Sequence, residues 1–403
     1  MINFKSKLVR GSLALLILVG IFNALNFLYH ILMARTLPLE DFGLLKRIFA
    51  FLYIGAIFME SIQTVIVRYV SKNVHEDGKL KTIFIKSNKK MAKVSIAVGG
   101  LFLAASLLIS PLFDIPYMLL IATSFFIAGS MFAPIARGIL QGQQRFLALG
   151  SSMLVEAALK IGISFLLVYW GLGVFGAVGG VVISLVLSMG LSLIYLRKVL
   201  SSNSEDVELT GIRSYSRPVF LVTLVLILFI NVDILLAGNL LGKLDAGVYA
   251  IASTIALIIF IGIQPVNKVL FPITAIESYK NIPSMPNFIR AMTIVLSICA
   301  VALTVILFFT EEIVYIISGE LILEAVVPAR LLSLGTAFLS LSSTILYYKL
   351  SIGRTKGYGW VLAFLLMEII LLAIFSSNIV DYSYAFLVAN ILFFIGSVVL
   401  LKK

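Results

Sequence analysis

Long apolar runs recur along the whole chain of 403 residues, and short polar stretches separate them. A run of about 20 residues is long enough for one helix to cross the roughly 30 Å hydrocarbon core of a bilayer. The composition supports this interpretation, because 61% of the residues are hydrophobic and only 12% are charged. A water-soluble protein of this length needs a larger charged surface, so we predict an integral membrane protein.

The polar breaks divide the chain into about twelve predicted spans. Backbone groups in hydrocarbon must be hydrogen-bonded within the spanning structure, and the continuous runs lack the alternation of a β-barrel. We therefore expect an all-α polytopic membrane protein. The spans are predicted to begin near Gly11, Leu44, Ala92, Ile115, Ser151, Val174, Pro218, Ala246, Ala291, Leu321, Gly357 and Asp381.

Basic residues give the chain a formal net charge of +12, which by itself is compatible with nucleic-acid binding. They lie mostly between spans, however: 25 of the 31 fall on the side of the N-terminus, five on the other side, and Lys160 inside a span. This asymmetry predicts that both termini are cytoplasmic, in the cell membrane, and that no nucleic acid is bound. The five outer residues include Lys46 and Arg47, and the longest inner connection, residues 69–91, is expected to lie on the anionic leaflet.

The two halves of the sequence resemble each other. Residues 31–37 read ILMARTL, residues 234–240 read ILLAGNL, and Gly43 then corresponds to Gly247 after one extra residue. This correspondence relates spans one and two to spans seven and eight, which predicts two six-helix lobes around a central cavity. The predicted parts are an N-terminal lobe (1–200), a cytoplasmic linker (201–217) and a C-terminal lobe (218–403).

Polar residues inside apolar spans are the main functional candidates, because a charge at the membrane centre costs roughly 2.5 to 3.5 kcal/mol on insertion scales. Spans two and five carry such residues at spacings of three and four, which place them on one helical face. Polar stripes from both halves predict a water-filled cavity. The charged candidates are Glu60, Arg68, Arg137, Glu156, Lys160, Asp233, Lys268 and Glu368, and Asn23, Asn26 and His30 accompany them in span one.

Most of these candidates also have a purely structural interpretation. Glu156 and Lys160 are four residues apart and can neutralise each other on one helix. Arg68, Arg137 and Lys268 stand near inner ends of spans, where long basic side chains extend to the interface. Uncharged polar side chains commonly bridge helices.

Asp233 and Glu368 differ from the other candidates, because neither has an obvious partner of opposite charge nearby in the sequence. A role in the cavity or in coupling to an ion is favoured for these two residues.

Motifs of familiar enzyme classes are lacking in the sequence. It has no Walker loop and no His-x-x-x-His pair, and its histidines are His30 and His75. The glycine-rich stretch 171–180, GLGVFGAVGG, has no acidic residue at the distance that a dinucleotide site requires, so it predicts a tight turn and close helix packing. The single cysteine, Cys299, predicts that the chain forms no internal disulfide. Because the motifs above are missing, we also expect no cofactor, no metal and no enzyme activity.

Several segments together resemble one family of membrane proteins. They are MARTLPLEDFGLLKRI with IVRYVSK, FAPIARGILQGQQRF, GLGVFGAVGGVVIS, and ISGELILEAVVPARLLSLG with SIGRTKGYG. In order and spacing they are similar to the polysaccharide biosynthesis, or oligosaccharide flippase, family of the multidrug/oligosaccharidyl-lipid/polysaccharide (MOP) exporter superfamily. The resemblance implies a MATE-like fold of twelve helices in two lobes, alternating between inward-open and outward-open states.

The resemblance also implies a cargo, an isoprenoid-phosphate-linked oligosaccharide that is moved from the cytoplasmic to the external leaflet. Membrane lipids and glycan assembly enzymes are the expected partners of a monomeric transporter. Lipid II flippases carry two further helices, which disfavours that cargo. The expected substrate-binding residues are Arg68, Arg137, Lys268, Lys160, Glu156 and Glu60, and the ion-coupling candidates are Asp233 and Glu368.

Two other functions are compatible with parts of the sequence. The runner-up is a cation-coupled antiporter of the same fold for drugs or small metabolites, which would depend on Asp233, Glu368 and Glu60. A non-transporting scaffold or an integral membrane glycosyltransferase is the third, and the short connections disfavour the glycosyltransferase.

Overall fold

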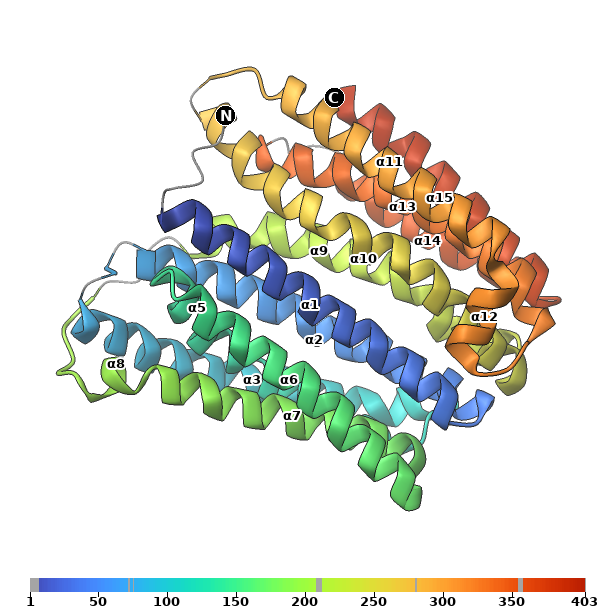
Figure 1. Cartoon of the computed structure of the whole chain (residues 1–403), viewed down its shortest axis with the longest axis horizontal. Helices are drawn as coiled ribbons and strands as arrows, with labels where there is room; N and C mark the ends of the chain where they lie inside the picture. The colour runs from blue at the N-terminus through green and yellow to red at the C-terminus, as the bar shows by residue number, and fades with distance from the viewer. Residues whose placement is uncertain are drawn as a thin grey trace. The chain divides into compact units, whose positions relative to one another are not determined.

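The computed structural model describes residues 7–71, 73–74, 76–207, 212–279, 281–353 and 358–402. These residues form helices with short connections and contain no strand, which confirms the all-α fold class (Figure 1). The helices are α1 (Lys7–Thr36), α2 (Leu39–Ser71), α3 (Asp77–Phe113), α4 (Tyr117–Ser130), α5 (Ala133–Gly142), α6 (Phe146–Leu167), the short π-type turn η1 (Val168–Leu172), α7 (Gly173–Tyr195), α8 (Arg197–Ser201), α9 (Ile212–Leu240), α10 (Lys243–Tyr279), α11 (Met285–Phe308), α12 (Thr310–Ser318), η2 (Leu323–Ala325), α13 (Val326–Ser351), α14 (Tyr358–Ile374) and α15 (Ile379–Lys402).

Nine stretches of the described residues are long and apolar enough to cross a membrane. One of them, Phe146–Tyr195, contains both α6 and α7, and two further apolar stretches, Leu226–Leu240 and Gly359–Ile374, are shorter. The chain is therefore a polytopic membrane protein. The number of twelve spans stays a prediction.

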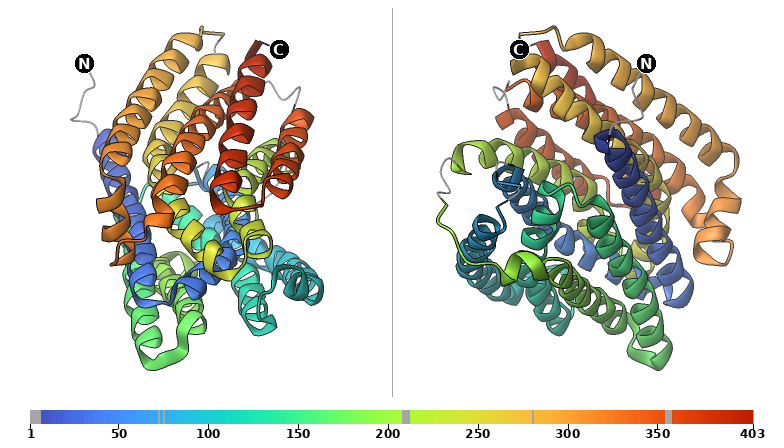
Figure 2. Two further views of the ribbon diagram at one scale, coloured as in Figure 1. Left: turned by 90° about the vertical axis from the view of Figure 1, so that its right-hand side faces the viewer. Right: turned by 60° about the vertical axis from the view of Figure 1, so that its left-hand side comes forward.

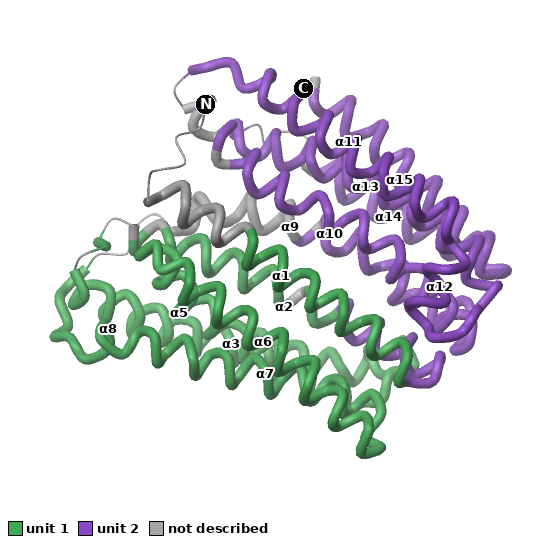
Figure 3. Tube along the Cα trace, viewed as in Figure 1, with its two compact units in different colours: residues 1–36, 51–220 green, residues 37–50, 221–403 purple. Residues whose placement is uncertain are grey.

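The chain divides into two compact units (Figure 3). Unit 1 comprises Met1–Thr36 and Phe51–Phe220, and unit 2 comprises Leu37–Ala50 and Leu221–Lys403. These units differ from the predicted lobes in residues 37–50, which group with the second half of the chain. Helix α2 consequently contributes its first part to unit 2 and the rest to unit 1.

The predicted connection 69–91 is largely helical. Helix α3 begins at Asp77 and has 37 residues, a length of about 55 Å that exceeds the hydrocarbon core. The linker after α8 lies against the start of this helix, since Lys81 Nζ donates to the Ser202 carbonyl at 2.7 Å and Lys86 Nζ pairs with Asp206 Oδ1 at 2.8 Å. The hydrogen bond from Lys86 lowers the pKa of the Asp206 carboxyl group.

The glycine-rich stretch 171–180 forms a tight turn and a close helix contact, as predicted. Gly171 and Gly173 have φ angles of 87° and 49° in the turn between α6 and α7, a conformation that glycine adopts without strain. Farther along α7, a Cβ on Gly180 would overlap the backbone and Oγ of Ser164 on α6. The two helices accordingly run side by side in both views of Figure 2.

Candidate functional site

Helix α5 places a buried arginine inside unit 1. Its glycines let it lie close to α2: a Cβ on Gly138 would be 2.8 Å from the Cβ of Ile66. Arg137, the preceding residue, is 5% exposed. A guanidinium group that is buried to this extent needs a carboxylate partner, because an unpaired charge loses its hydration without replacement.

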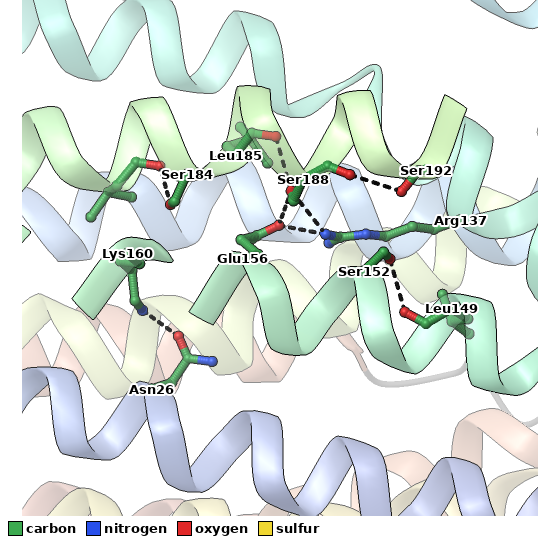
Figure 4. Close-up of polar contacts among 11 residues, drawn as sticks. Asn26, Arg137, Leu149, Ser152, Glu156, Lys160, Ser184, Leu185, Ser188 and Ser192 are labelled. Atoms are coloured by element: carbon green, nitrogen blue, oxygen red, sulfur yellow. Dashed lines mark hydrogen bonds and ion pairs between the residues drawn. The ribbon is translucent and has the colours of Figure 1, made fainter. Parts of the chain in front are cut away.

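Glu156 on α6 supplies that carboxylate (Figure 4). Arg137 Nη2 lies 2.5 Å from Glu156 Oε2, and Ser188 Oγ on α7 donates to the same oxygen at 2.8 Å. Arg137 Nε has no hydrogen-bond partner among the described residues. The ion pair joins α5 and α6, and Ser188 extends it to α7.

Lys160 lies one turn after Glu156 on α6 and is also buried. Its Nζ donates to Asn26 Oδ1 on α1 (Figure 4). The same Nζ lies 4.6 Å from the centroid of the Tyr29 ring, a cation–π geometry. Asn26 and Tyr29 orient the ammonium group, and Glu156, one turn earlier, acts on it electrostatically. Arg137, Glu156 and Lys160 together carry a net positive charge inside a span-rich unit, and that charge favours an anionic ligand.

Unit 2 contains a buried acidic pair. Asp233 on α9 is 2% exposed and Glu368 on α14 is fully buried, and the two carboxyl groups interact electrostatically. Tyr249 Oη on α10 donates to Asp233 Oδ2 at 2.7 Å, and Tyr382 Oη on α15 donates to the Asp233 carbonyl at 2.7 Å. Asp233 Oδ1 and both carboxylate oxygens of Glu368 make no hydrogen bond of standard geometry among the described residues, although the Asn390 side chain is close enough to Glu368 to act on it.

An apolar layer adjoins the acidic pair on the same helices. One turn before Asp233, Phe229 stacks on Phe393 of α15 with a centroid distance of 4.2 Å. Phe364, one turn before Glu368 on α14, has its ring centroid 5.8 Å from that of Phe393. Carboxyl groups next to such a layer are poorly solvated, so they need a proton or a cation as partner.

Lys46 and Arg47 were predicted to be outer-face charges that set the topology, and the structure buries both. Lys46 is 6% exposed and Arg47 is 2% exposed, and Lys46 interacts electrostatically with Asp233. The sequence held one signal for this burial, because the second predicted span starts near Leu44 and therefore includes both residues. Both residues are thus packed inside the protein, and the side of the membrane to which they belong stays a prediction.

Two of the remaining predicted site residues, Lys268 and Glu60, lie outside these clusters. Lys268 on α10 and Glu60 on α2 are exposed, and the side chain of Arg68 lies outside the described residues. His30 on α1, a polar candidate from span one, has Nε2 at 3.4 Å from Tyr53 Oη on α2. In the part of the chain that the structure describes, no three His, Cys, Asp or Glu side chains form a group that could hold a metal ion.

Comparison with known proteins identifies the family. A family model described as polysaccharide biosynthesis protein matches residues 8–276. An uncharacterized membrane protein of Methanocaldococcus jannaschii is 25% identical, over 93% of this chain and 94% of its own.

Solved structures show the fold. The lipid II flippase MurJ in an inward closed conformation superposes with a TM-score of 0.74 at 17% identity, over 98% of this chain and 88% of that chain. An inward-facing multidrug resistance MATE family transporter of the MOP superfamily gives a TM-score of 0.70 at 17% identity, over 94% of each chain. The resemblance seen in the sequence is confirmed: the chain belongs to the polysaccharide biosynthesis protein family and has the fold of the MOP superfamily.

Proposed function

We propose that this protein is a flippase that moves an isoprenoid-phosphate-linked oligosaccharide from the cytoplasmic to the external leaflet of the cell membrane by alternating access. The observation that carries the proposal is the buried, net-cationic group of Arg137, Glu156 and Lys160 in a member of a polysaccharide biosynthesis family. A net positive charge disfavours a cationic cargo, and a neutral cargo would gain no ion pair from it.

The physical task of a flippase explains why this group is useful. A glycan on a lipid phosphate cannot cross hydrocarbon, because its hydroxyl groups and charge would lose water without replacement. Basic side chains form charge-assisted hydrogen bonds with phosphate oxygens. Arg137 and Lys160 are the proposed phosphate ligands, with Glu156 holding Arg137 in place, and Arg68, Lys268 and Glu60 are proposed to contact the cargo elsewhere on its path.

The energy source in this proposal is the membrane gradient. A membrane potential that is negative inside favours outward movement of an anion by about 2.3 kcal/mol per charge per 100 mV. Asp233 and Glu368 are proposed to take up a proton or a cation during the return step, since three of their four carboxylate oxygens make no hydrogen bond of standard geometry among the described residues. This coupling would add to the potential-driven step.

The acidic pair also supports a second candidate function, a cation-coupled antiporter of drugs or small metabolites. Such a transporter needs a buried acidic group that a proton or Na⁺ can neutralise, and Asp233 with Glu368 meets this requirement. The cargo distinguishes the two functions.

The test follows a fluorescent isoprenoid-diphosphate glycan between the leaflets of liposomes that contain the purified protein. We expect Lys160→Met to lower the initial rate by about tenfold or more, equivalent to about 1.4 kcal/mol in the barrier, and Lys160→Arg to retain most of it. Lys89→Met is the matched control, because Lys89 is exposed on α3.

Two outcomes would contradict this assignment. If Lys160→Met, Arg137→Met and wild type moved the glycan at equal rates, Lys160 and Arg137 would not be the phosphate ligands. Proton- or Na⁺-driven efflux of a soluble cationic dye, without glycan movement, would establish the antiporter instead.

A further inference from the structure

The first part of α2, residues 37–50, is held against unit 2 by a backbone contact between helices. A Cβ on Gly43 would lie 3.0 Å from the backbone N of Gly247 on α10, and a Cβ on Gly247 would overlap the carbonyl of Leu39. These glycines are the two that correspond in the internal repeat. Because the rest of α2 belongs to unit 1, this docked segment links the two units covalently.

The docked segment brings two cations into unit 2. The guanidinium of Arg47 occupies the space beside Gly238 on α9, where a Cβ would overlap it. Lys46, one residue earlier, is 6% exposed and acts on Asp233 of the same helix. Attraction between Lys46 and Asp233 therefore contributes to holding residues 37–50 on α9 and α10.

The groups that face the acidic pair leave its charge unbalanced. From α10 and α15, Tyr249 and Tyr382 donate hydrogen bonds to Asp233, and Asn390 on α15 is close enough to act on Glu368. Lys46 acts on Asp233 from α2, and three of the four carboxylate oxygens of the pair make no hydrogen bond of standard geometry among the described residues. One further positive charge completes the balance.

We propose that Lys46 is a tethered counter-ion of the Asp233–Glu368 pair and that it competes with a free proton or Na⁺ for this pair. The inference rests on the ion-coupling role proposed above for Asp233 and Glu368, and it adds a residue that regulates that role. Competition is reciprocal: a cation bound at the pair weakens the hold on residues 37–50, and release of these residues strengthens cation binding.

The first test measures cation binding to the purified full-length protein through its thermal stability. NaCl is titrated against KCl at constant ionic strength, and in a separate series the pH is varied without Na⁺. A ligand that binds only the folded state raises the midpoint temperature of unfolding. Once its concentration exceeds the dissociation constant, the stabilisation grows with the logarithm of the concentration. The Na⁺ series and the pH series distinguish the two cations.

Lys46→Met is expected to bind the cation more tightly, because the competing ammonium is gone. The dissociation constant for Na⁺ should fall about tenfold, or the pH of half-effect should rise by about one unit. Lys46→Arg should behave as wild type, and Lys243→Met, at an exposed lysine on α10, is the matched control. Lys46→Gln replaces Lys46→Met if the latter does not fold.

The second test measures docking itself. In a Cys299→Ser background, spin labels at positions 40 and 244, both exposed, report the distance between the start of α2 and the start of α10. When the cation is bound, a larger fraction of molecules should show a long distance between the two labels, as expected when residues 37–50 leave α10. In Lys46→Met this fraction should be large without the cation and should not change when the cation is added.

The outcomes separate the two proposals. Equal cation responses in wild type and Lys46→Met, with the same distance distributions, would overturn the role of Lys46 alone. No response of either protein to Na⁺ or pH would overturn the ion-coupling role of Asp233 and Glu368 and the role of Lys46 with it.

Discussion

At the scale of single residues, the ion pair between Arg137 and Glu156 gives a prediction about stability. Glu156→Ala leaves a buried guanidinium without its carboxylate, so the free energy of unfolding should fall by about 2 to 3 kcal/mol. This lies below the cost for a fully buried pair, because 18% of the Glu156 side chain is exposed. Unfolding by SDS in mixed micelles measures the change.

The matched control replaces both partners. Arg137→Met combined with Glu156→Met removes the unpaired charge, and it should recover most of the stability while still losing glycan transport. A double variant as unstable as Glu156→Ala would show that the pair has another structural role.

The buried charges that could be found from the sequence lie deep within apolar runs, and those that were missed lie near the ends of such runs. Glu156, Lys160, Asp233 and Glu368 lie deep in apolar runs, where a charge is costly, and all but Glu156 are buried below 9% exposure. Lys46 stands near the start of a run, where sequence alone cannot separate an interfacial lysine from a buried one. The pairing of Arg137 with Glu156 also depends on packing between helices, which no local pattern encodes.

At the scale of helices, the close approach of α6 and α7 predicts unequal tolerance among the glycines of α7. Gly180→Val should destabilise the protein by about 1 to 3 kcal/mol or more, since its side chain would overlap Ser164. Gly190→Val lies on the same helix with open space beside it and carries the same change in helix propensity. Equal loss for both variants in SDS unfolding would exclude packing as the cause.

Helix boundaries were predictable where glycine or proline marks them and not where a helix continues into water. The turn at Gly171 and Gly173 was found from its composition. The third span was predicted to begin near Ala92, whereas α3 itself begins at Asp77, since the lysines from Lys79 onward look like a connection in the sequence. Lysine is a good helix former, so a spanning helix extends past the membrane at little cost.

At the scale of the whole molecule, each half of the chain has a polar pair on its first and fifth predicted spans. In the first half, Asn26 on α1 accepts a hydrogen bond from Lys160 on α6, and in the second half, Asp233 on α9 and Glu368 on α14 interact electrostatically. The predicted repeat would thus present a basic group suited to an anionic cargo in one half and an acidic group suited to a cation in the other.

The orientation of the chain in the membrane remains a prediction from the basic residues. Single cysteines at position 170, between α6 and α7, and at position 204, in the linker after α8, are placed in a Cys299→Ser background; both positions are exposed. The charge asymmetry predicts that a membrane-impermeant maleimide labels position 170 in intact cells and position 204 only after permeabilisation. The reverse pattern would overturn the predicted orientation, whereas a potential that is negative inside favours outward movement of an anionic cargo in either orientation.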